Sequence, residues 1–324
     1  MDRRRLVGVG LVLVSACAFG SGALFGKPAY ATGIDWLVLS AWRFLFGAAA
    51  SWVWVLVSPE RRAGLAGLDR RAIAVALALG LLYLGNSGTY YAGLETVDAS
   101  LAALIVYVYP ALVAVLTLRV GRPLEGRRAW GALAFALIGV VLAVGGIDTR
   151  TPPPLGGLLL IVASPVIYSI WIVLAARLSG ERRQPEQAPI DGSVADAIGA
   201  ASALMMSATA SGYWFLALAA GRPVLAGSIP VPAWPHLIGI GLVATFVAIQ
   251  TFYAGTQRIG AAQASLISTI EPIWTISLAA LLLGESLGPI QLVGGALILL
   301  GVVIAQTGPS LAGAARPAVR LADE

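Results

Sequence analysis

The chain has 324 residues, of which 58% are hydrophobic and only 11% are charged, and its formal net charge is +5. A soluble domain carries about 25% charged residues, so this chain cannot cover its apolar surface with polar groups and needs lipid around it. The positive charge does not indicate nucleic-acid binding, because it gathers between apolar runs. The single cysteine excludes an intrachain disulfide and a thiol-rich metal site.

Ten apolar runs follow one another along the chain. Crossing about 30 Å of hydrocarbon takes roughly 20 apolar residues at 1.5 Å rise per residue, and the runs approach that length. The first run follows a basic N-terminus but has no A-x-A-like cleavage site, so we interpret it as a retained helix. We therefore predict an all-α integral membrane protein with ten transmembrane helices, at Leu6–Phe25, Trp36–Val57, Ala72–Ala92, Ala99–Leu118, Ala129–Gly146, Leu155–Ala176, Ala195–Ala220, Pro235–Gly255, Ala262–Leu283 and Pro289–Gln306.

The basic residues predict the orientation. If the N-terminus is cytoplasmic, 17 of the 21 lysines and arginines fall in cytoplasmic segments and three, Lys27, Arg150 and Arg222, fall outside. Arg43 lies inside a run. Loops rich in Lys and Arg stay in the cytoplasm. We predict that both termini are cytoplasmic and that the chain is a multi-pass protein of the bacterial inner membrane.

The two halves of the chain repeat one pattern. Residues 90–94 (YYAGL) match residues 252–256 (FYAGT), and Pro110 and Pro272 follow at the same offset. Residues 121–124 (GRPL) match 284–287 (GESL) after a one-residue insertion. Five helices per half make the second half enter the membrane from the opposite side, so the repeat is an inverted 5+5 repeat. We predict repeats at residues 1–150 and 151–308 and a disordered cytoplasmic tail at residues 309–324.

The end of the second repeat carries a spaced set of residues that resembles a known signature. The chain is similar to the drug/metabolite transporter superfamily, EamA type, over nearly its whole length, and most to the bacterial aromatic amino acid exporters typified by YddG. The resemblance implies a cytoplasmic-membrane carrier with a central cavity, lined mainly by helices one, three, four, six, eight and nine. The residues that carry it are Glu271-Pro272, Leu283-Gly284-Glu285, Gln291, Gly294-Gly295 and Gly301-Val302.

Polar and aromatic side chains within the runs are the candidates for substrate binding. They are costly in hydrocarbon unless they face protein or water. Aromatic rings with a few amides and hydroxyls suit an amphipathic solute such as an aromatic or neutral amino acid. Alternatively, tyrosines and tryptophans form interfacial belts, and the amides of Asn86 and Gln250 hydrogen-bond helices together. The candidates are Tyr83, Asn86, Tyr90, Tyr107, Ser164, Tyr168, Trp171, Gln250, Tyr253, Ser268 and Trp274.

Two charged residues lie well inside the runs, away from their ends, namely Arg43 and Glu271. As a functional group, Glu271 would titrate a proton or bind a substrate ammonium. As a structural group, it would pair with Arg43 or satisfy backbone groups freed by Pro272. Arg43 could instead snorkel towards the membrane surface.

Pro110 and Pro272 each remove one helical hydrogen bond. They predict either hinges, about which the two halves rock, or static kinks.

The leading hypothesis is an exporter of aromatic or neutral amino acids and similar small metabolites. The alternative within transport is a multidrug, nucleoside, purine or sugar-type carrier. A membrane-embedded enzyme is disfavoured, because the chain has neither HExxH nor GxSxG and its single histidine, His236, lies at the edge of a run. We expect no cofactor, no metal, no nucleic-acid partner and a monomer. Uniport and proton antiport both stay open.

Overall fold

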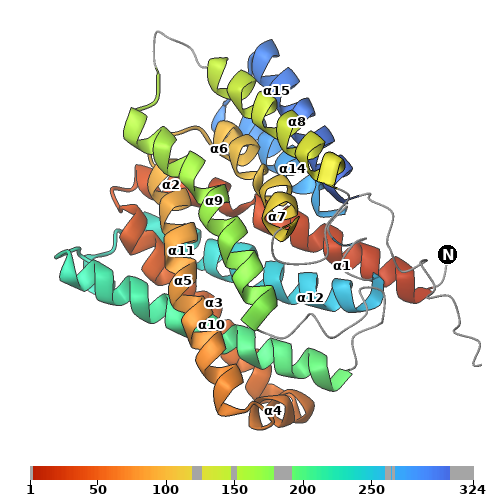
Figure 1. Ribbon diagram of the computed structural model, residues 1–324. Helices are drawn as coiled ribbons and strands as arrows, with labels where there is room; N and C mark the ends of the chain where they lie inside the picture. The colour runs from red at the N-terminus through yellow and green to blue at the C-terminus, as the bar shows by residue number, and fades with distance from the viewer. Residues whose placement is uncertain are drawn as a thin grey trace, which may run out of the picture.

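The computed structural model describes residues 3–118, 126–146, 152–178, 192–259, 264 and 267–306. Within these residues the backbone forms helices, turns and short connections, and no strand occurs. The helices are gathered in one bundle (Figure 1). The predicted tail at residues 309–324 lies outside the described residues, as do most of residues 178–194, which join the sixth and seventh predicted runs. Seven of the arginines counted for the orientation also lie outside them: Arg119, Arg122, Arg150, Arg182, Arg183, Arg316 and Arg320.

Each of the ten predicted runs contains helix. Five described helical stretches are long and apolar enough to cross a membrane by length and composition, namely Arg3–Ala31, Trp36–Val57, Arg70–Leu94, Leu155–Leu174 and Val231–Ile259. The total of ten spans stays a prediction. The helices are α1 (Arg3–Gly20), α2 (Gly22–Ala31), α3 (Trp36–Val57), α4 (Pro59–Ala66), α5 (Arg70–Leu94), α6 (Ala99–Val106), α7 (Tyr109–Leu118), α8 (Gly126–Gly145), α9 (Leu155–Leu178), α10 (Gly192–Ala219), α11 (Trp234–Gly241), α12 (Ala248–Ile259), α14 (Ile270–Leu278) and α15 (Pro289–Gln306).

Several predicted helices are interrupted rather than continuous. The first run divides into α1 and α2, and the fourth divides at residues 107–108 between α6 and α7. In the eighth, a π-helical stretch called η4 (Leu242–Val247) joins α11 to α12, and in the ninth α14 ends in a second π-helical stretch, η5 (Ala279–Leu283). π-Helical turns often mark functional sites. These two helices are therefore candidates for a functional role in addition to crossing the membrane.

The helix α4 was not predicted. Ser58 caps it by accepting from the backbone N–H of Arg61, and Pro59 occupies its first turn, where a missing N–H costs nothing. The Arg61 guanidinium lies 3.6 Å from the ring centroid of Trp54 and donates to the Trp54 carbonyl. This arrangement anchors a short polar helix to the end of α3.

The helices pack most extensively in four pairs: α8 with α15, α3 with α10, α1 with α12, and α5 with α9. Helix α10 also packs against α5, and α6 packs against α14. In Figure 1, α8 and α15 lie side by side at the top, and α1 and α12 at the right. Glycines permit the close approach of α8 to α15. A Cβ on Gly139 would lie 2.5 Å from the Gly294 carbonyl oxygen, and a Cβ on Gly294 would lie equally close to the Gly139 carbonyl oxygen.

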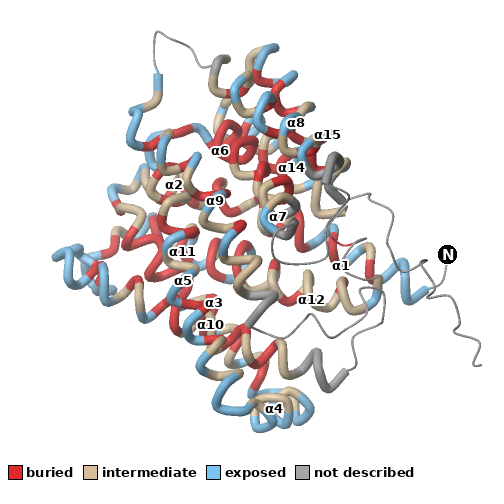
Figure 2. The backbone as a smooth tube through the Cα atoms, viewed as in Figure 1, coloured by how far each residue is buried: buried red, intermediate tan, exposed pale blue. Residues whose placement is uncertain are grey.

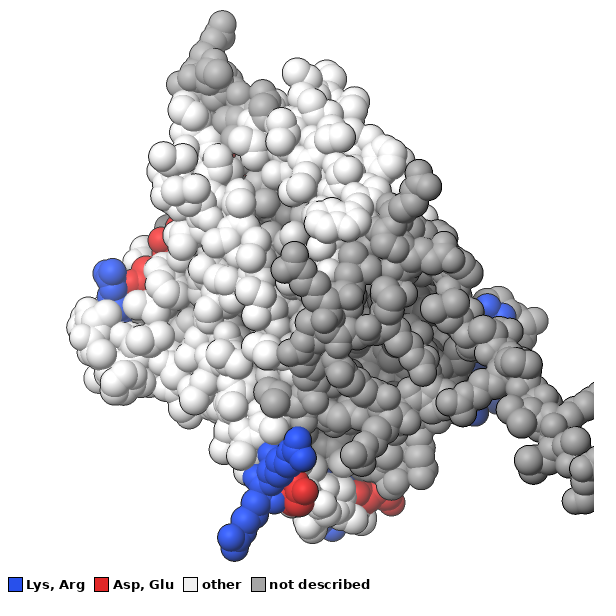
Figure 3. Space-filling view, viewed as in Figure 1, with Lys and Arg blue, Asp and Glu red and all other residues white. Residues whose placement is uncertain are grey.

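The buried core runs through the bundle, with its largest shares on α3 and α6 (Figure 2). Large apolar side chains elsewhere face outward, including Val141 at 68% and Leu281 at 77% exposure. In Figure 3 the described Lys, Arg, Asp and Glu side chains lie towards the edges of this face, and the other described residues visible on it are uncharged. An apolar exterior of this extent needs lipid, so the chain is a multi-pass membrane protein.

Candidate functional site

Six aromatic side chains from four parts of the bundle form one connected group, which we call the aromatic cluster. It comprises Phe44, Tyr83, Tyr107, Tyr109, Tyr168 and Trp171. Tyr83 on α5 lies 5.3 Å from Trp171 and 6.4 Å from Tyr168, both on α9, measured between ring centroids. Tyr168 is stacked with Trp171 at 5.9 Å. The sequence periodicity that put Tyr83 on one face of α5 and Tyr168 on one face of α9 therefore brings these rings together.

The polar tips of this cluster are held by backbone carbonyls of other helices. Trp171 Nε1 donates to the Leu79 carbonyl at 2.9 Å, and the Tyr107 hydroxyl donates to the Ser268 carbonyl. A buried aromatic residue with a polar tip needs such a partner. The rings are thereby fixed in orientation, with their faces free for packing.

The two candidate amides form interhelical hydrogen bonds. Asn86 Oδ1 accepts from the Ser164 hydroxyl at 3.1 Å, which joins α5 to α9. Gln250 Nε2 donates to the Ser202 hydroxyl at 3.4 Å, which joins α12 to α10. Both amide side chains are buried. These contacts match the structural alternative for the two amides, and they place Asn86 one turn beyond Tyr83 at the edge of the aromatic cluster.

Glu271, near the start of α14, lies among the tyrosines. Its carboxylate makes no hydrogen bond and no ion pair with the described residues, and only its backbone carbonyl accepts, from Thr275 Oγ1. The Tyr107 hydroxyl donates to the carbonyl of Ser268, three residues before Glu271. Glu271 therefore lies close in sequence to the Tyr107 end of the aromatic cluster.

Arg43 neither snorkels nor pairs with Glu271, so both structural alternatives for Arg43 are wrong in this structure. The side chain is 6% exposed, and its Nε donates to Thr245 Oγ1 at 2.8 Å. Its guanidinium carbon lies 4.5 Å from the ring centroid of Tyr91 and 4.9 Å from that of Phe44. Within the described residues the ion pair that forms is Arg222 with Asp35, at the end of the bundle.

The π-helical stretch η4 supplies the hydrogen-bond acceptors for Arg43. Thr245 Oγ1 donates to the Ile240 carbonyl five residues earlier, and Arg43 Nη2 lies 3.5 Å from the Ala244 carbonyl oxygen. The wider turn leaves acceptors facing α3 that a regular α-helix would use internally. Arg43 therefore joins α3 to η4.

The other predicted site residues lie around the aromatic cluster without joining it. Tyr90 packs against Tyr91 at 5.0 Å, and Tyr253 packs against Phe252 and acts electrostatically on Tyr168. The Ser268 hydroxyl bonds within its own helix, to the Ala264 carbonyl. Trp274 is 37% exposed and donates to Ser21 Oγ at 3.1 Å. We place Trp274 at the contact of α14 with the α1–α2 junction, outside the cluster.

Both prolines follow a break in their helix. Pro110 is the second residue of α7, directly after the interruption at residues 107–108, and Pro272 is the third residue of α14. At the start of a helix the missing N–H has no intrahelical partner to lose. The broken helices are observed, whereas hinge motion about them stays a prediction.

Sequence reasoning missed two members of the site: Phe44 belongs to the aromatic cluster, and Tyr213 on α10 stacks on Phe44 at 5.5 Å. Tyr109, beside Pro110, and Thr245, which matches Tyr83 in the repeat, are candidates on sequence grounds, and the structure places Tyr109 in the cluster and Thr245 against Arg43. Nothing in the sequence marked Tyr213, because its role depends on how α10 packs against α3.

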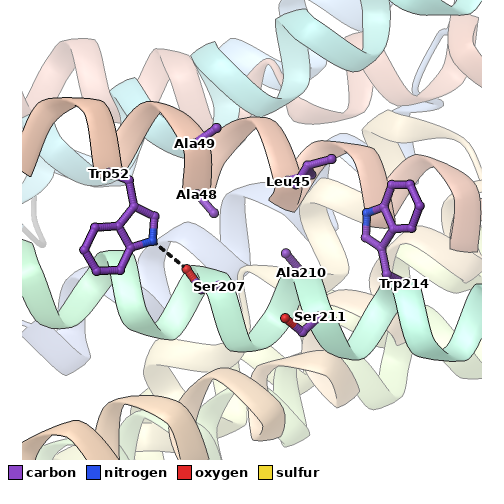
Figure 4. Close-up of a pocket in the computed structure, with 8 residues that line it drawn as sticks. All are labelled: Leu45, Ala48, Ala49, Trp52, Ser207, Ala210, Ser211 and Trp214. Atoms are coloured by element: carbon purple, nitrogen blue, oxygen red, sulfur yellow. Dashed lines mark hydrogen bonds between the residues drawn. The ribbon is translucent and has the colours of Figure 1, made fainter. Parts of the chain in front are cut away.

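A pocket of about 530 Å³ lies elsewhere, in a groove between α3 and α10 (Figure 4). Trp52 and Trp214 stand at its two ends, with alanines and serines between them, and Trp52 Nε1 donates to Ser207 Oγ. None of the predicted site residues lines it. Its exposed Leu45 and Ser211 place it on the outer face of the bundle.

A second, smaller cavity of about 330 Å³ surrounds Glu285, in the loop between η5 and α15. The Glu285 carboxylate accepts from the backbone N–H groups of Ala99 and Ser100 at 2.9 and 2.8 Å, and from the Ser100 hydroxyl at 2.8 Å. It thus caps the N-terminus of α6 from another part of the chain. Within the described residues, no group of three or more His, Cys, Asp or Glu side chains is placed to hold a metal ion.

The comparisons with known proteins agree with a transport fold. An uncharacterized transporter of Bacillus subtilis, YcbK, is 27% identical over 90% of this chain and 90% of its own length. An uncharacterized transporter of Archaeoglobus fulgidus is 26% identical over 92% of this chain and 96% of its own. A crystal structure with a TM-score of 0.57 and 19% identity covers 94% of this chain and 97% of its own, which shows a shared fold. Residues 6–145 and again 155–307 match the EamA-like transporter family. The chain belongs to the EamA-like transporter family of membrane proteins.

Proposed function

We propose that this transporter exports aromatic or neutral amino acids and similar small metabolites, by alternating access through the space beside the aromatic cluster. The observation that carries the proposal is the connected set of aromatic rings, together with Glu271, whose carboxylate has no partner among the described residues. Rings favour the apolar side chain of such a solute, and the carboxylate favours its ammonium. The likeness to YddG-type exporters made on sequence grounds supports the same substrate class.

The inverted 5+5 repeat is part of the proposal. When the predicted helices are numbered one to ten, the four most extensive pairs join five with ten, two with seven, one with eight and three with six. Exchanging the two halves converts the pair one–eight into the pair six–three and leaves the pairs five–ten and two–seven unchanged. Two successive stretches of the chain match the same family, and a helix break precedes both Pro110 and Pro272. Both observations support the same repeat.

The proposed topology puts both termini in the cytoplasm of a bacterium, with the protein a monomer in the inner membrane. The support is the distribution of basic residues along the sequence. Attachment of a membrane-impermeant thiol reagent to cysteines introduced at exposed positions in α4 and in the loop around Arg222 would test it. Labelling of the α4 position from the outside of intact cells would contradict the orientation.

The decisive experiment is counterflow in proteoliposomes without an ion gradient. Vesicles are loaded with unlabelled phenylalanine, threonine, thymidine or buffer, and entry of the matching labelled solute is followed. We expect accumulation with phenylalanine, lost in Trp171→Ala or Asn86→Ala. Accumulation with thymidine alone would move the substrate class to nucleosides. No accumulation with either amino acid, in protein shown to be folded, would reject amino acid transport.

A further inference from the structure

The groove between α3 and α10 opens on the outer face of the bundle (Figure 4). Its volume of about 530 Å³ lies within the range of small-molecule sites, and two of its lining residues, Leu45 and Ser211, are exposed. The rest of the lining consists of three alanines, Ser207, Trp52 and Trp214. None of these side chains carries a charge, so an apolar chain fits the groove better than a charged solute does.

The indole N–H groups at the two ends of the groove have partners within the protein. Trp52 Nε1 donates to Ser207 Oγ at 2.8 Å, and Trp214 Nε1 donates to the Ala41 carbonyl at 3.2 Å. The Ser207 hydroxyl in turn donates to the Ala203 carbonyl at 2.8 Å. Since these donors are used, the groove offers mainly rings and methyl groups, which favour contact with hydrocarbon.

The groove lies at the depth of the acyl chains of one membrane leaflet. At 1.5 Å per residue, Trp52 is about 8 Å and Leu45 about 18 Å from the end of α3 at Val57. One leaflet of a bilayer with about 30 Å of hydrocarbon is about 15 Å deep. The groove therefore extends from near the α4 end of α3 to about the middle of the membrane, as a phospholipid tail does.

A basic side chain lies at the α4 end of the groove. Leu56 follows Trp52 by one turn on the same face of α3, and the Leu56 carbonyl accepts from Arg62 Nη1 at 3.0 Å. Arg62 is exposed, and this single contact leaves donors of its five-donor fork for a phosphate group. The face of α3 that lines the groove therefore leads directly to a guanidinium.

Helix α4 is held in place by both walls of the groove. The Arg61 guanidinium lies 3.6 Å from the ring centroid of Trp54 on α3, and α4 also packs against α10. In Figure 1, α4 lies at the bottom of the bundle, below α3 and α10, and Figure 3 shows basic side chains in the same region. The position of Arg62 relative to the groove is thus fixed by packing.

The segment from residue 58 to residue 71 is positively charged. It carries four arginines and two acids, which give a net charge of +2. Both acids are engaged locally: Glu60 accepts from the Ser58 hydroxyl, and Asp69 accepts from the Ala72 backbone N–H. Basic segments next to a membrane attract anionic headgroups. A second copy of the chain on this groove would instead bring the same positive segment to the same side of the membrane.

We propose that the groove between α3 and α10 binds one acyl chain of an anionic phospholipid, and that Arg62 binds the phosphate of its headgroup. The chain packs along the alanines between Trp52 and Trp214. The six residues of the aromatic cluster are not among the groove's lining residues, so this site holds a resident lipid rather than the transported solute.

The first test measures the headgroup preference. Purified full-length protein in detergent is titrated with phosphatidylglycerol or phosphatidylcholine carrying the same dioleoyl chains, and native mass spectrometry measures the fraction with lipid bound. Phosphatidylglycerol should bind about fivefold more tightly. In Arg62→Gln the two lipids should bind equally. Arg70→Gln, which removes an exposed arginine at the start of α5, is the matched control and should keep the preference.

The second test fills the groove. Ser211→Phe adds a ring from an exposed position, so the fold should tolerate it, and binding of both lipids should fall about tenfold because acyl contact is lost. Val141→Phe, at an exposed apolar position on α8, is the matched control and should leave lipid binding unchanged. If Ser211→Phe does not fold, Ala49→Phe fills the groove from an exposed position on α3.

Three results would overturn the lipid site. Equal binding of the two lipids by the wild type, or equal losses of preference in Arg62→Gln and Arg70→Gln, would show that Arg62 holds no headgroup. Unchanged lipid binding in folded Ser211→Phe or Ala49→Phe would show that the groove holds no acyl chain. A dimer of the wild type that Ser211→Phe dissociates would assign the groove to a second copy of the chain. None of these results depends on which solute the protein transports.

Discussion

Two glutamates fourteen residues apart, Glu271 and Glu285, belong to the same C-terminal signature but have opposite surroundings. Glu285 accepts three hydrogen bonds at the N-terminus of α6, where the helix dipole also favours a negative charge. Glu271 accepts none from the described residues and lies among tyrosines. The comparison teaches that a shared motif does not imply a shared role, because the partners of each carboxylate come from distant parts of the chain.

The largest effect should come from Glu271→Gln. Removing this charge should lower phenylalanine counterflow about 100-fold, which is a loss of roughly 2.7 kcal/mol of substrate stabilisation. The melting temperature should stay the same or rise, because the variant removes a half-buried carboxyl that has no partner among the described residues. Counterflow and thermal unfolding of the same preparation measure both. A fall in melting temperature with normal counterflow would assign Glu271 a structural role.

Glu285→Gln should show the reverse pattern. The variant weakens the cap on α6, and we expect a loss of about 1–2 kcal/mol in the free energy of unfolding. Counterflow per folded molecule should change little. Glu60→Gln is the matched control, because the exposed Glu60 carboxylate accepts from Ser58 within its own helix rather than from a distant segment. Equal losses in the free energy of unfolding in Glu60→Gln and Glu285→Gln would show that the long-range cap stabilises the fold no more than the local contact does.

A smaller effect is expected for the ion pair between Arg222 and Asp35, which are 52% and 24% exposed with Arg222 Nε 3.0 Å from the Asp35 carboxylate. Exposed pairs contribute about 0–1 kcal/mol. Arg222→Gln should therefore lower the melting temperature slightly in low salt and not at all in high salt. A large, salt-independent loss would show that this end of the bundle depends on the pair.

The smallest effect concerns Glu95, whose Oε1 accepts from the Trp36 N–H at the start of α3. Burial raises the pKa of the Glu95 carboxyl above its ordinary 4.5, and the hydrogen bond from Trp36 offsets part of that rise. In the window just above pH 4.5 the folded chain then binds a proton more readily than the unfolded chain, so this group's contribution to stability grows as the pH falls. The melting temperature of the wild type relative to Glu95→Gln should rise between pH 7 and pH 5. A relative fall would mean that the charged carboxylate is the favoured form.

Local sequence patterns anticipated part of the site because it depends on spacing within one helix. Tyr83 and Asn86 share a face of α5, and Ser164, Tyr168 and Trp171 share a face of α9. The two faces contact each other through Tyr83 with Trp171 and through Asn86 with Ser164. The helix breaks before Pro110 and Pro272 also follow from local chemistry, since proline cannot donate a backbone hydrogen bond.

Long-range packing decided the rest. Residues more than 180 positions apart meet when Arg43 binds Thr245 and when Glu285 caps α6. Packing between helices also determines that Gln250 bonds to Ser202, that Trp274 bonds to Ser21, and that Phe44 stacks with Tyr213.

The sequence by itself determined the class of this protein, because a chain that is 58% hydrophobic and 11% charged has too few polar side chains to face water on every side. Its apolar runs and small residues also determined where helices form and where they approach closely. Only the tertiary structure decided which buried polar groups are satisfied and which are left open. That outcome depends on the relative rotation and depth of packed helices, which apolar periodicity constrains to a face but not to a partner.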